Sequence, residues 1–183
     1  MRYALLALCA ACSLGGHRPT YSYFVLTSAP AAATPPGGRA VTIAQVTIPG
    51  YLDREQMASR MAGNQLVYST SDRWAEPLDQ AFERTLRADL AARGIDVQSR
   101  ADAELSIDVL RFERTGPDHV ELWARWTLRG DGRVIDRGET RLHVALSGQD
   151  SSAIASALSE AIARMASQIA LRVRNPEPSV SAT

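Results

Sequence analysis

Two long segments of the chain repeat apolar residues at the spacing of a helix. The first predicts a helix over 77–93, because Pro77 suits the first helical position. The second predicts a helix that ends at about Val173 and is capped by Asp150 or Ser151. Each helix therefore has one apolar face to bury. The two stripes are Leu78, Phe82, Leu86 and Leu90 in the first helix, and Ile154, Leu158, Ile162, Met165 and Ile169 in the second.

Elsewhere apolar and polar residues alternate with a period of two, which is typical of half-buried strands. The predicted strands cover residues 21–26, 40–48, 65–70, 95–98, 103–115, 120–128 and 134–146. The pattern over 51–58 predicts one short helical turn, and Gly130-Asp131-Gly132 predicts a hairpin turn. The alternation reverses within 103–115, which indicates a bulge or a strand end covered on both faces. Gly138 is expected to break the last strand.

This order of elements predicts an α+β fold. Runs of strands with two one-sided helices favour a mostly antiparallel mixed β-sheet with both long amphipathic helices packed on one face. At 183 residues the chain fits one domain, which we place at residues 21–174. Residues 175–183 are rich in proline and serine and are expected to form a flexible tail.

The first residues have the pattern of a bacterial lipoprotein signal. Arg2 precedes an apolar run, and two alanines lead directly into Cys12. We therefore expect residues 1–11 to be a signal peptide, Cys12 to carry the lipid, and residues 12–20 to form a tether. The alternative is an ordinary buried N-terminal helix, and the abrupt change to glycine and proline after Cys12 argues against it.

Composition narrows the possible partners and sites. All 20 basic residues are arginine, so loss of Arg2 with the signal leaves 19 basic and 20 acidic residues, a net charge of −1. A near-neutral chain has no long-range field to gather nucleic acid, so none is expected as a partner. Both cysteines, Cys9 and Cys12, precede the predicted domain. The folded part can then form neither a disulfide nor a thiolate metal site.

The sequence lacks the common motifs of catalysis. It contains no HExxH or CxxC metal motif, no GxSxG elbow and no glycine-rich nucleotide loop. The three histidines, His17, His119 and His143, are scattered, and the last two are expected to face solvent or a neighbouring strand. We therefore predict a protein that is not an enzyme and that holds no cofactor and no metal.

Two short patches place an aromatic residue close to an arginine in predicted connections. They consist of Tyr51, Leu52 and Arg54 in the first patch, and Arg73, Trp74, Pro77 and Leu78 in the second. Aromatic residues and arginine dominate interface energetics, so these residues are candidates for a subunit or partner interface. Local packing is an equal alternative, in which Trp74 covers the start of the helix and Arg73 pairs with a nearby carboxylate.

Three segments resemble a known family. Residues 48–56 (IPGYLDREQ) resemble its LPEYLDRPQ segment, and residues 72–78 (DRWAEPL) resemble its RWAEPL segment. Residues 21–26 (YSYFVL) are similar to the aromatic YYTL strand that follows the lipid anchor. On these segments the chain resembles the PqiC family, the auxiliary lipoproteins of ABC-type and MCE-type transport systems. Gly50 and Glu55 depart from the family pattern.

The resemblance implies a non-enzymatic lipoprotein, anchored in the inner leaflet of the outer membrane and facing the periplasm. It implies an accessory subunit of a system that transports lipids between the inner and outer membranes and supports envelope integrity. The implied partners are an MCE-domain protein, the membrane that holds the lipid anchor, and further copies of the chain in a homo-oligomeric ring.

Two other functions stay open at this point. One is a structural outer-membrane assembly lipoprotein that assists a β-barrel. The other is a lipid-carrying periplasmic protein, which would need a large apolar cavity. Phe82, Phe112 and Trp126, together with the leucine and isoleucine stripes, are sufficient to fill an ordinary core.

Overall fold

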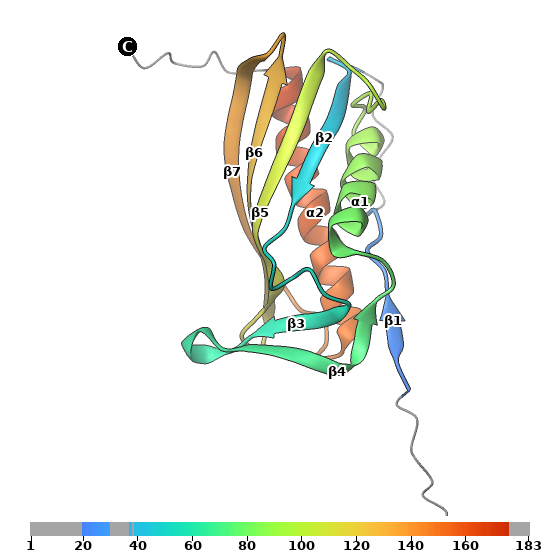
Figure 1. Ribbon diagram of the computed structural model, residues 1–183, viewed down its shortest axis with the longest axis vertical. Coiled ribbons are helices and arrows are strands. Elements are labelled where there is room, and N and C mark those ends of the chain that lie inside the picture. The colour runs from blue at the N-terminus through green and yellow to red at the C-terminus, as the bar shows by residue number, and fades with distance from the viewer. Residues whose placement is uncertain (1–19, 30–36, 38, 176–183) are drawn as a thin grey trace, which may run out of the picture.

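The computed structural model describes residues 20–29, 37 and 39–175, and runs of strands in it are separated by single helices (Figure 1). The strands are β1 (Ser22–Phe24), β2 (Val41–Thr47), β3 (Gln56–Arg60), β4 (Leu66–Trp74), β5 (Ala103–Thr115), β6 (His119–Gly130) and β7 (Arg133–Ala145). The helices are α1 (Leu78–Ala92) and α2 (Ser151–Arg174), and a short 3₁₀ turn, η1 (Ala62–Asn64), joins β3 to β4. The predicted signal peptide, Cys12, most of the tether and the tail beyond Asn175 lie outside the described residues.

The seven strands form one mixed sheet in the order β1-β4-β3-β5-β6-β7, with β2 also beside β5. The long strands β5, β6 and β7 are antiparallel neighbours, whereas β1 pairs with β4, and β2 and β3 pair with β5, in parallel. β3 meets β5 only at Ser59 and Arg60. The β3–β4 hairpin therefore crosses the lower end of the molecule in Figure 1, while β2 and β5–β7 run along its length.

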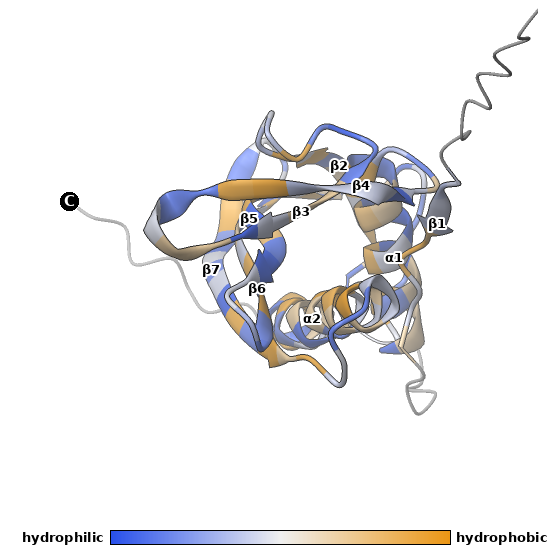
Figure 2. Ribbon diagram, turned by 90° about the horizontal axis from the view of Figure 1, so that it is seen from below, coloured by the Kyte–Doolittle hydropathy of each residue, from blue (hydrophilic) through white to orange (hydrophobic). Residues whose placement is uncertain are grey.

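The two helices pack against each other and against the sheet, as predicted. α2 contacts β6 and β7, and α1 contacts β2 and α2; Figure 2 shows both helices on the same side of the sheet. Every residue of the two predicted stripes is buried. The Asp150 side chain accepts a hydrogen bond from the backbone N–H of Ala153 at 2.8 Å, which makes Asp150 the helix cap. Neither helix is long and apolar enough to cross a membrane, as far as the described residues go.

A bulge in β5 accounts for the reversed alternation in the sequence. The register with β6 shifts between Val109 and Arg111. Phe112 therefore returns to the helix-facing side, where its ring lies edge-on to that of Phe82 with the ring centroids 5.2 Å apart. The bulge keeps both halves of a long strand in contact with one core.

Two local predictions are wrong. Residues 51–58 do not form a helical turn, because β3 occupies Gln56–Arg60 and pairs with both β4 and β5. These partners are distant in sequence, so tertiary pairing overrides the local pattern. Residues 95–98 form no strand of their own, and only an isolated bridge joins Val97 to Val41.

The last strand is also continuous at Gly138, contrary to the predicted break. The reason is the neighbouring Trp126 on β6, since a Cβ atom at Gly138 would lie 2.4 Å from Cζ2 of the indole. Glycine is therefore required by the close approach of a ring and not by a bend. The hairpin turn before this strand is as predicted, with positive φ at both Asp131 and Gly132.

Candidate functional site

The two predicted patches meet at one hollow on the side of the molecule. The end of β1, the β2–β3 connection and the β4–α1 connection surround a space of about 340 Å³. Its lining consists of Tyr23, Asp53, Arg54, Glu55, Trp74, Ala75, Glu76, Pro77 and Leu78. Members of both patches, Arg54 from the first and Trp74, Pro77 and Leu78 from the second, therefore share one site.

Backbone hydrogen bonds hold these three segments together. The N–H of Trp74 donates to the carbonyl of Glu55 at 2.6 Å, and the N–H of Ala75 donates to the carbonyl of Phe24 at 2.9 Å. β4 continues to Trp74, beyond the predicted end at Thr70. The second patch therefore begins inside a strand, contrary to its predicted place in a connection.

Three residues of the predicted set belong to the core beneath the hollow. Leu52, Trp74 and Leu78 are only 4%, 6% and 2% exposed. Side chains so deeply buried offer little area to a partner, and the burial of Trp74 is what the local-packing interpretation expects. Arg54 and Pro77 are exposed, and for them the interface assignment stays a prediction.

Arg73 is held by its own strand. Its Nη1 donates to the carbonyl of Ser69 at 2.9 Å and its Nη2 donates to the carbonyl of Thr70 at 3.2 Å. The guanidinium also lies over the ring of Tyr21, 4.6 Å from the centroid. Arg73 thus meets carbonyl oxygens and an aromatic face in place of the expected carboxylate, and its contacts fix the junction of β4 with the start of β1.

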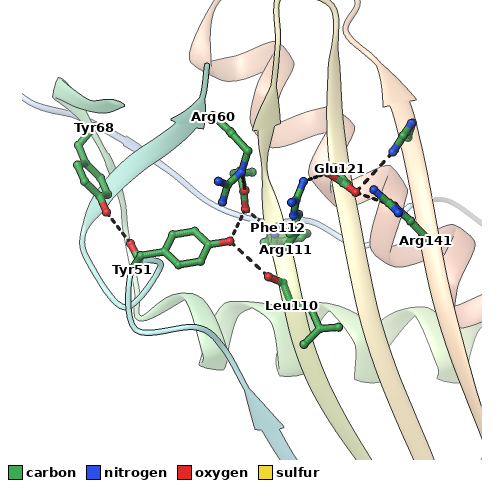
Figure 3. A network of polar contacts seen from close by, with 10 residues as sticks. Tyr51, Arg60, Tyr68, Leu110, Arg111, Phe112, Glu121 and Arg141 are labelled. Atoms are coloured by element: carbon green, nitrogen blue, oxygen red, sulfur yellow. Dashed lines mark hydrogen bonds and ion pairs between the residues drawn. The ribbon is translucent and has the colours of Figure 1, made fainter. Parts of the chain in front are cut away.

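Tyr51 fastens the β2–β3 connection onto β5 (Figure 3). Its hydroxyl donates to Oε2 of the buried Glu113 at 2.9 Å, and Nε of Arg60 donates to Oε1 of the same carboxylate at 2.7 Å. Burial, reinforced by the charge of Glu113, raises the pKa of Tyr51 to about 12. The Tyr68 hydroxyl donates to the Tyr51 carbonyl, and the Arg54 guanidinium lies over the Tyr68 ring, 4.9 Å from its centroid. Tyr51 and Arg54 therefore both contact Tyr68.

The rim of the hollow is acidic. Asp53 and Glu55 are exposed, and the Glu76 carboxylate accepts a hydrogen bond from Arg84. Arg54 is the one cation among the described lining residues. A basic side chain from a partner would meet carboxylates here, next to the ring of Tyr23.

A second cluster, which the sequence analysis missed, lies on the sheet face opposite the helices. The buried carboxylate of Glu121 accepts hydrogen bonds from Arg111 at 2.9 Å and from Arg141 at 2.8 Å, and both guanidinium groups lie near the Trp123 ring. Burial opposes ionisation of Glu121, but the two arginines hold its pKa below the usual value. The alternation over residues 119–127 predicts a half-exposed strand, but it does not predict which residues lie beside it. The two arginines are brought together by the register of β5, β6 and β7.

The two described histidines lie on neighbouring strands, as expected. The ring centroids of His119 and His143 are 5.0 Å apart. Within residues 20–29, 37 and 39–175, no group of three or more His, Cys, Asp or Glu side chains is placed to hold a metal ion.

Comparisons with known proteins identify the family. The family described as "ABC-type transport auxiliary lipoprotein component" matches residues 24–170. The intermembrane transport lipoprotein PqiC of Escherichia coli K12 is 32% identical over 144 residues, covering 70% of this chain and 72% of that protein. The chain belongs to the ABC-type transport auxiliary lipoprotein family. Its relatives are thus transport components and not known enzymes, and the resemblance to PqiC seen in the sequence is confirmed. The Shigella flexneri protein of the same name matches to the same extent.

Two solved structures share the fold. A crystal structure of an uncharacterized protein has a TM-score of 0.72 at 25% identity and covers 84% of this chain and 99% of its own. A protein from Xanthomonas campestris has a TM-score of 0.71 at 19% identity and covers 83% of this chain and 95% of its own. At that identity the second likeness supports the fold alone.

Proposed function

We propose that this chain is an accessory subunit of an ABC-type and MCE-type system that transports lipids between the inner and outer membranes and supports envelope integrity. The observation that carries the proposal is the match to the auxiliary lipoprotein family over residues 24–170. The similarity to PqiC, which is named for intermembrane transport, supports the same role.

The proposed location is the inner leaflet of the outer membrane, with the domain facing the periplasm. Cys12 would carry the lipid. Ser13 and Leu14 follow it, with no aspartate directly after the cysteine, and this resembles the sorting pattern of outer-membrane lipoproteins.

The hollow is the proposed contact for the MCE-domain partner. It combines the exposed ring of Tyr23, the exposed Arg54 and Pro77, and the carboxylates of Asp53 and Glu55 on one rim. Charge complementarity favours a partner segment that places a basic residue on the carboxylates and an acidic residue on Arg54. Further copies of the chain, arranged as a homo-oligomeric ring, complete the proposed assembly.

The lipid-carrying alternative receives no support from the described residues. A contiguous cluster of buried side chains from the sheet and both helices fills the space between them. A carrier would need that space for its ligand.

Co-purification of the lipidated full chain with the MCE-domain protein tests the proposal. We expect Arg54→Ala to weaken the complex by about 30-fold, the effect of losing a hot spot of about 2 kcal/mol. Arg164→Ala is the matched control, because among the described residues this exposed arginine pairs with Glu160 of the same helix. The free energy of unfolding of both variants should lie within about 0.5 kcal/mol of the wild-type value, as is usual for surface substitutions.

The outcomes separate the two parts of the proposal. If the wild-type chain does not capture the MCE-domain protein, the accessory role is wrong. If Arg54→Ala and Arg164→Ala bind as well as wild type, the role stands and the hollow is not the contact.

A further inference from the structure

Exposed apolar side chains gather at the end of the molecule that carries the β3–β4 hairpin. Met61 and Val67 of this hairpin are 48% and 46% exposed, and Tyr21, just before β1, is 41% exposed. Single exposed apolar residues are ordinary on a protein surface, but several at one end mark an interaction surface.

These residues belong to one uncharged strip. β4 crosses the lower end of the molecule from the hairpin to β1 (Figures 1 and 2). Ser22 pairs with Asp72 in parallel register, so Tyr21 lies at the level of Ser71. Residues 20–22 and 61–71, which we call the uncharged strip, contain no aspartate, glutamate or arginine.

The apolar surface extends beyond the strip to the β5–β6 turn. Met61 and Ala62 line an open hollow of about 440 Å³ together with Arg114, Thr115, Gly116 and Pro117. The Arg114 guanidinium donates hydrogen bonds to the carbonyls of Gly116 and Pro117. The strip thus continues into this hollow.

The chain leaves the described structure at the same end. Thr20 is the first residue of the strip, and Cys12 precedes it by about eight residues, a span of at most roughly 30 Å at 3.6 Å per residue. A lipid on Cys12 would hold this end of the domain close to the bilayer surface. Val134 and Leu171, also exposed, belong to the start of β7 and the last turns of α2. These parts of the two elements lie at the opposite end of the molecule (Figure 1).

We propose that the uncharged strip rests in the headgroup region of the membrane that holds the Cys12 lipid; this rests on the lipid anchor of the proposed function. Tyrosine favours this region because its ring is apolar and its hydroxyl stays hydrated. Met61 and Val67 add apolar contact, and the strip's own side chains carry no charge that would have to be dehydrated. The Arg73 guanidinium over the Tyr21 ring already donates hydrogen bonds to the carbonyls of Ser69 and Thr70. The strip would thus orient the domain as well as strengthen its attachment.

Site-specific labels test this orientation. Both natural cysteines precede the domain, so a single engineered cysteine reports only its own surroundings once Cys12 is acylated. The lipidated full chain carrying Val67→Cys, labelled with an environment-sensitive fluorophore, is bound to phosphatidylcholine vesicles. Leu171→Cys, 62% exposed at the opposite end, is the matched control. We expect a blue shift and quenching by headgroup-nitroxide lipid for the Val67 label, and no change for the Leu171 label. Met61→Cys repeats the measurement if Val67→Cys fails to fold.

Each outcome decides the proposal. A chain that floats with the vesicles while the two labels respond equally, or not at all, overturns the resting strip and leaves the anchor intact. A chain that does not float refutes the anchor and the strip's role together. The Val67 label could also be shielded from water before vesicles are added, and more so at higher protein concentration. This result would show that a second copy of the chain covers the strip, and it would overturn the proposal.

Discussion

Glu113 shows how one buried charge organises the connection beside the hollow. Its side chain is fully buried in β5 and receives hydrogen bonds from the Tyr51 hydroxyl, the Arg60 guanidinium and the Phe112 N–H. A buried carboxylate is tolerable only when its partners replace water. Tyr51 is therefore a structural residue beside the hollow.

Replacing Tyr51 tests this role. Tyr51→Phe removes the donor to Glu113 but keeps the ring, so we expect it to lower the free energy of unfolding by about 1.5–3 kcal/mol, the usual value of a hydrogen bond to a charged group. Tyr23→Phe, at an exposed ring, should change it by less than about 0.5 kcal/mol. Urea unfolding measures both, and equal stabilities of the two variants would contradict the assignment.

The same variant predicts a pH dependence. The folded chain raises the pKa of Tyr51 from 10.0 to about 12, so it holds the phenolic proton more tightly than the unfolded chain does. This contribution to stability is complete below pH 10 and is lost as the pH rises from 10 to 12. Wild type should therefore lose stability more steeply than Tyr51→Phe between pH 10 and pH 12 in urea titrations, and parallel slopes would argue against the raised pKa.

At the scale of elements, α2 is the centre of the packing. It contacts α1, β6 and β7, and its apolar stripe of five residues is buried throughout. Leu171, on the same helix but off the stripe, is 62% exposed. One helix thus offers a buried and an exposed leucine for direct comparison.

We predict different costs for these two leucines. Leu158→Ala should reduce the free energy of unfolding by about 2–5 kcal/mol, because a cavity is left in the core. Leu171→Ala should cost less than about 0.5 kcal/mol. A small effect at Leu158 in chemical denaturation would mean that the stripe is not core.

At the scale of the whole molecule, β1 joins the proposed anchor to the core. Leu26 is fully buried, its carbonyl accepts a hydrogen bond from Arg84 at 2.9 Å, and the next N–H, that of Thr27, donates to the Ser159 hydroxyl at 3.1 Å. β1 also pairs with β4. A pull on the N-terminus is therefore transmitted to both helices and to the hairpin.

Truncation tests the predicted start of the domain at residue 21. A chain that begins at Thr20 should unfold at the same urea concentration as the full processed chain. A chain that begins at Ser28 lacks Leu26 altogether. Its free energy of unfolding should fall by more than the roughly 2–5 kcal/mol expected for Leu26→Ala alone. Equal midpoints for the two truncated chains would place the start of the domain after β1.

The sequence by itself determined those features whose causes are local. The helical stripes, the reversed alternation in β5 and the turn at Asp131-Gly132 follow from residue spacing and from backbone preferences within a few positions. That the reversal is a bulge was decided by the register with β6. The family followed from short segments such as 48–56 and 72–78. Of the candidate site, the sequence predicted residues in both halves, but not that the two halves face each other.

The tertiary structure decided what depends on distant partners. Residues 56–60 form a strand because β4 and β5 offer them hydrogen bonds, and Gly138 stays in its strand because Trp126 leaves no room for a Cβ atom. Packing likewise divided the predicted patches, placing Trp74 in the core and Arg54 on the surface. Residue type and spacing do not predict such neighbours, because the burial of a residue depends on which surfaces meet after the chain has folded.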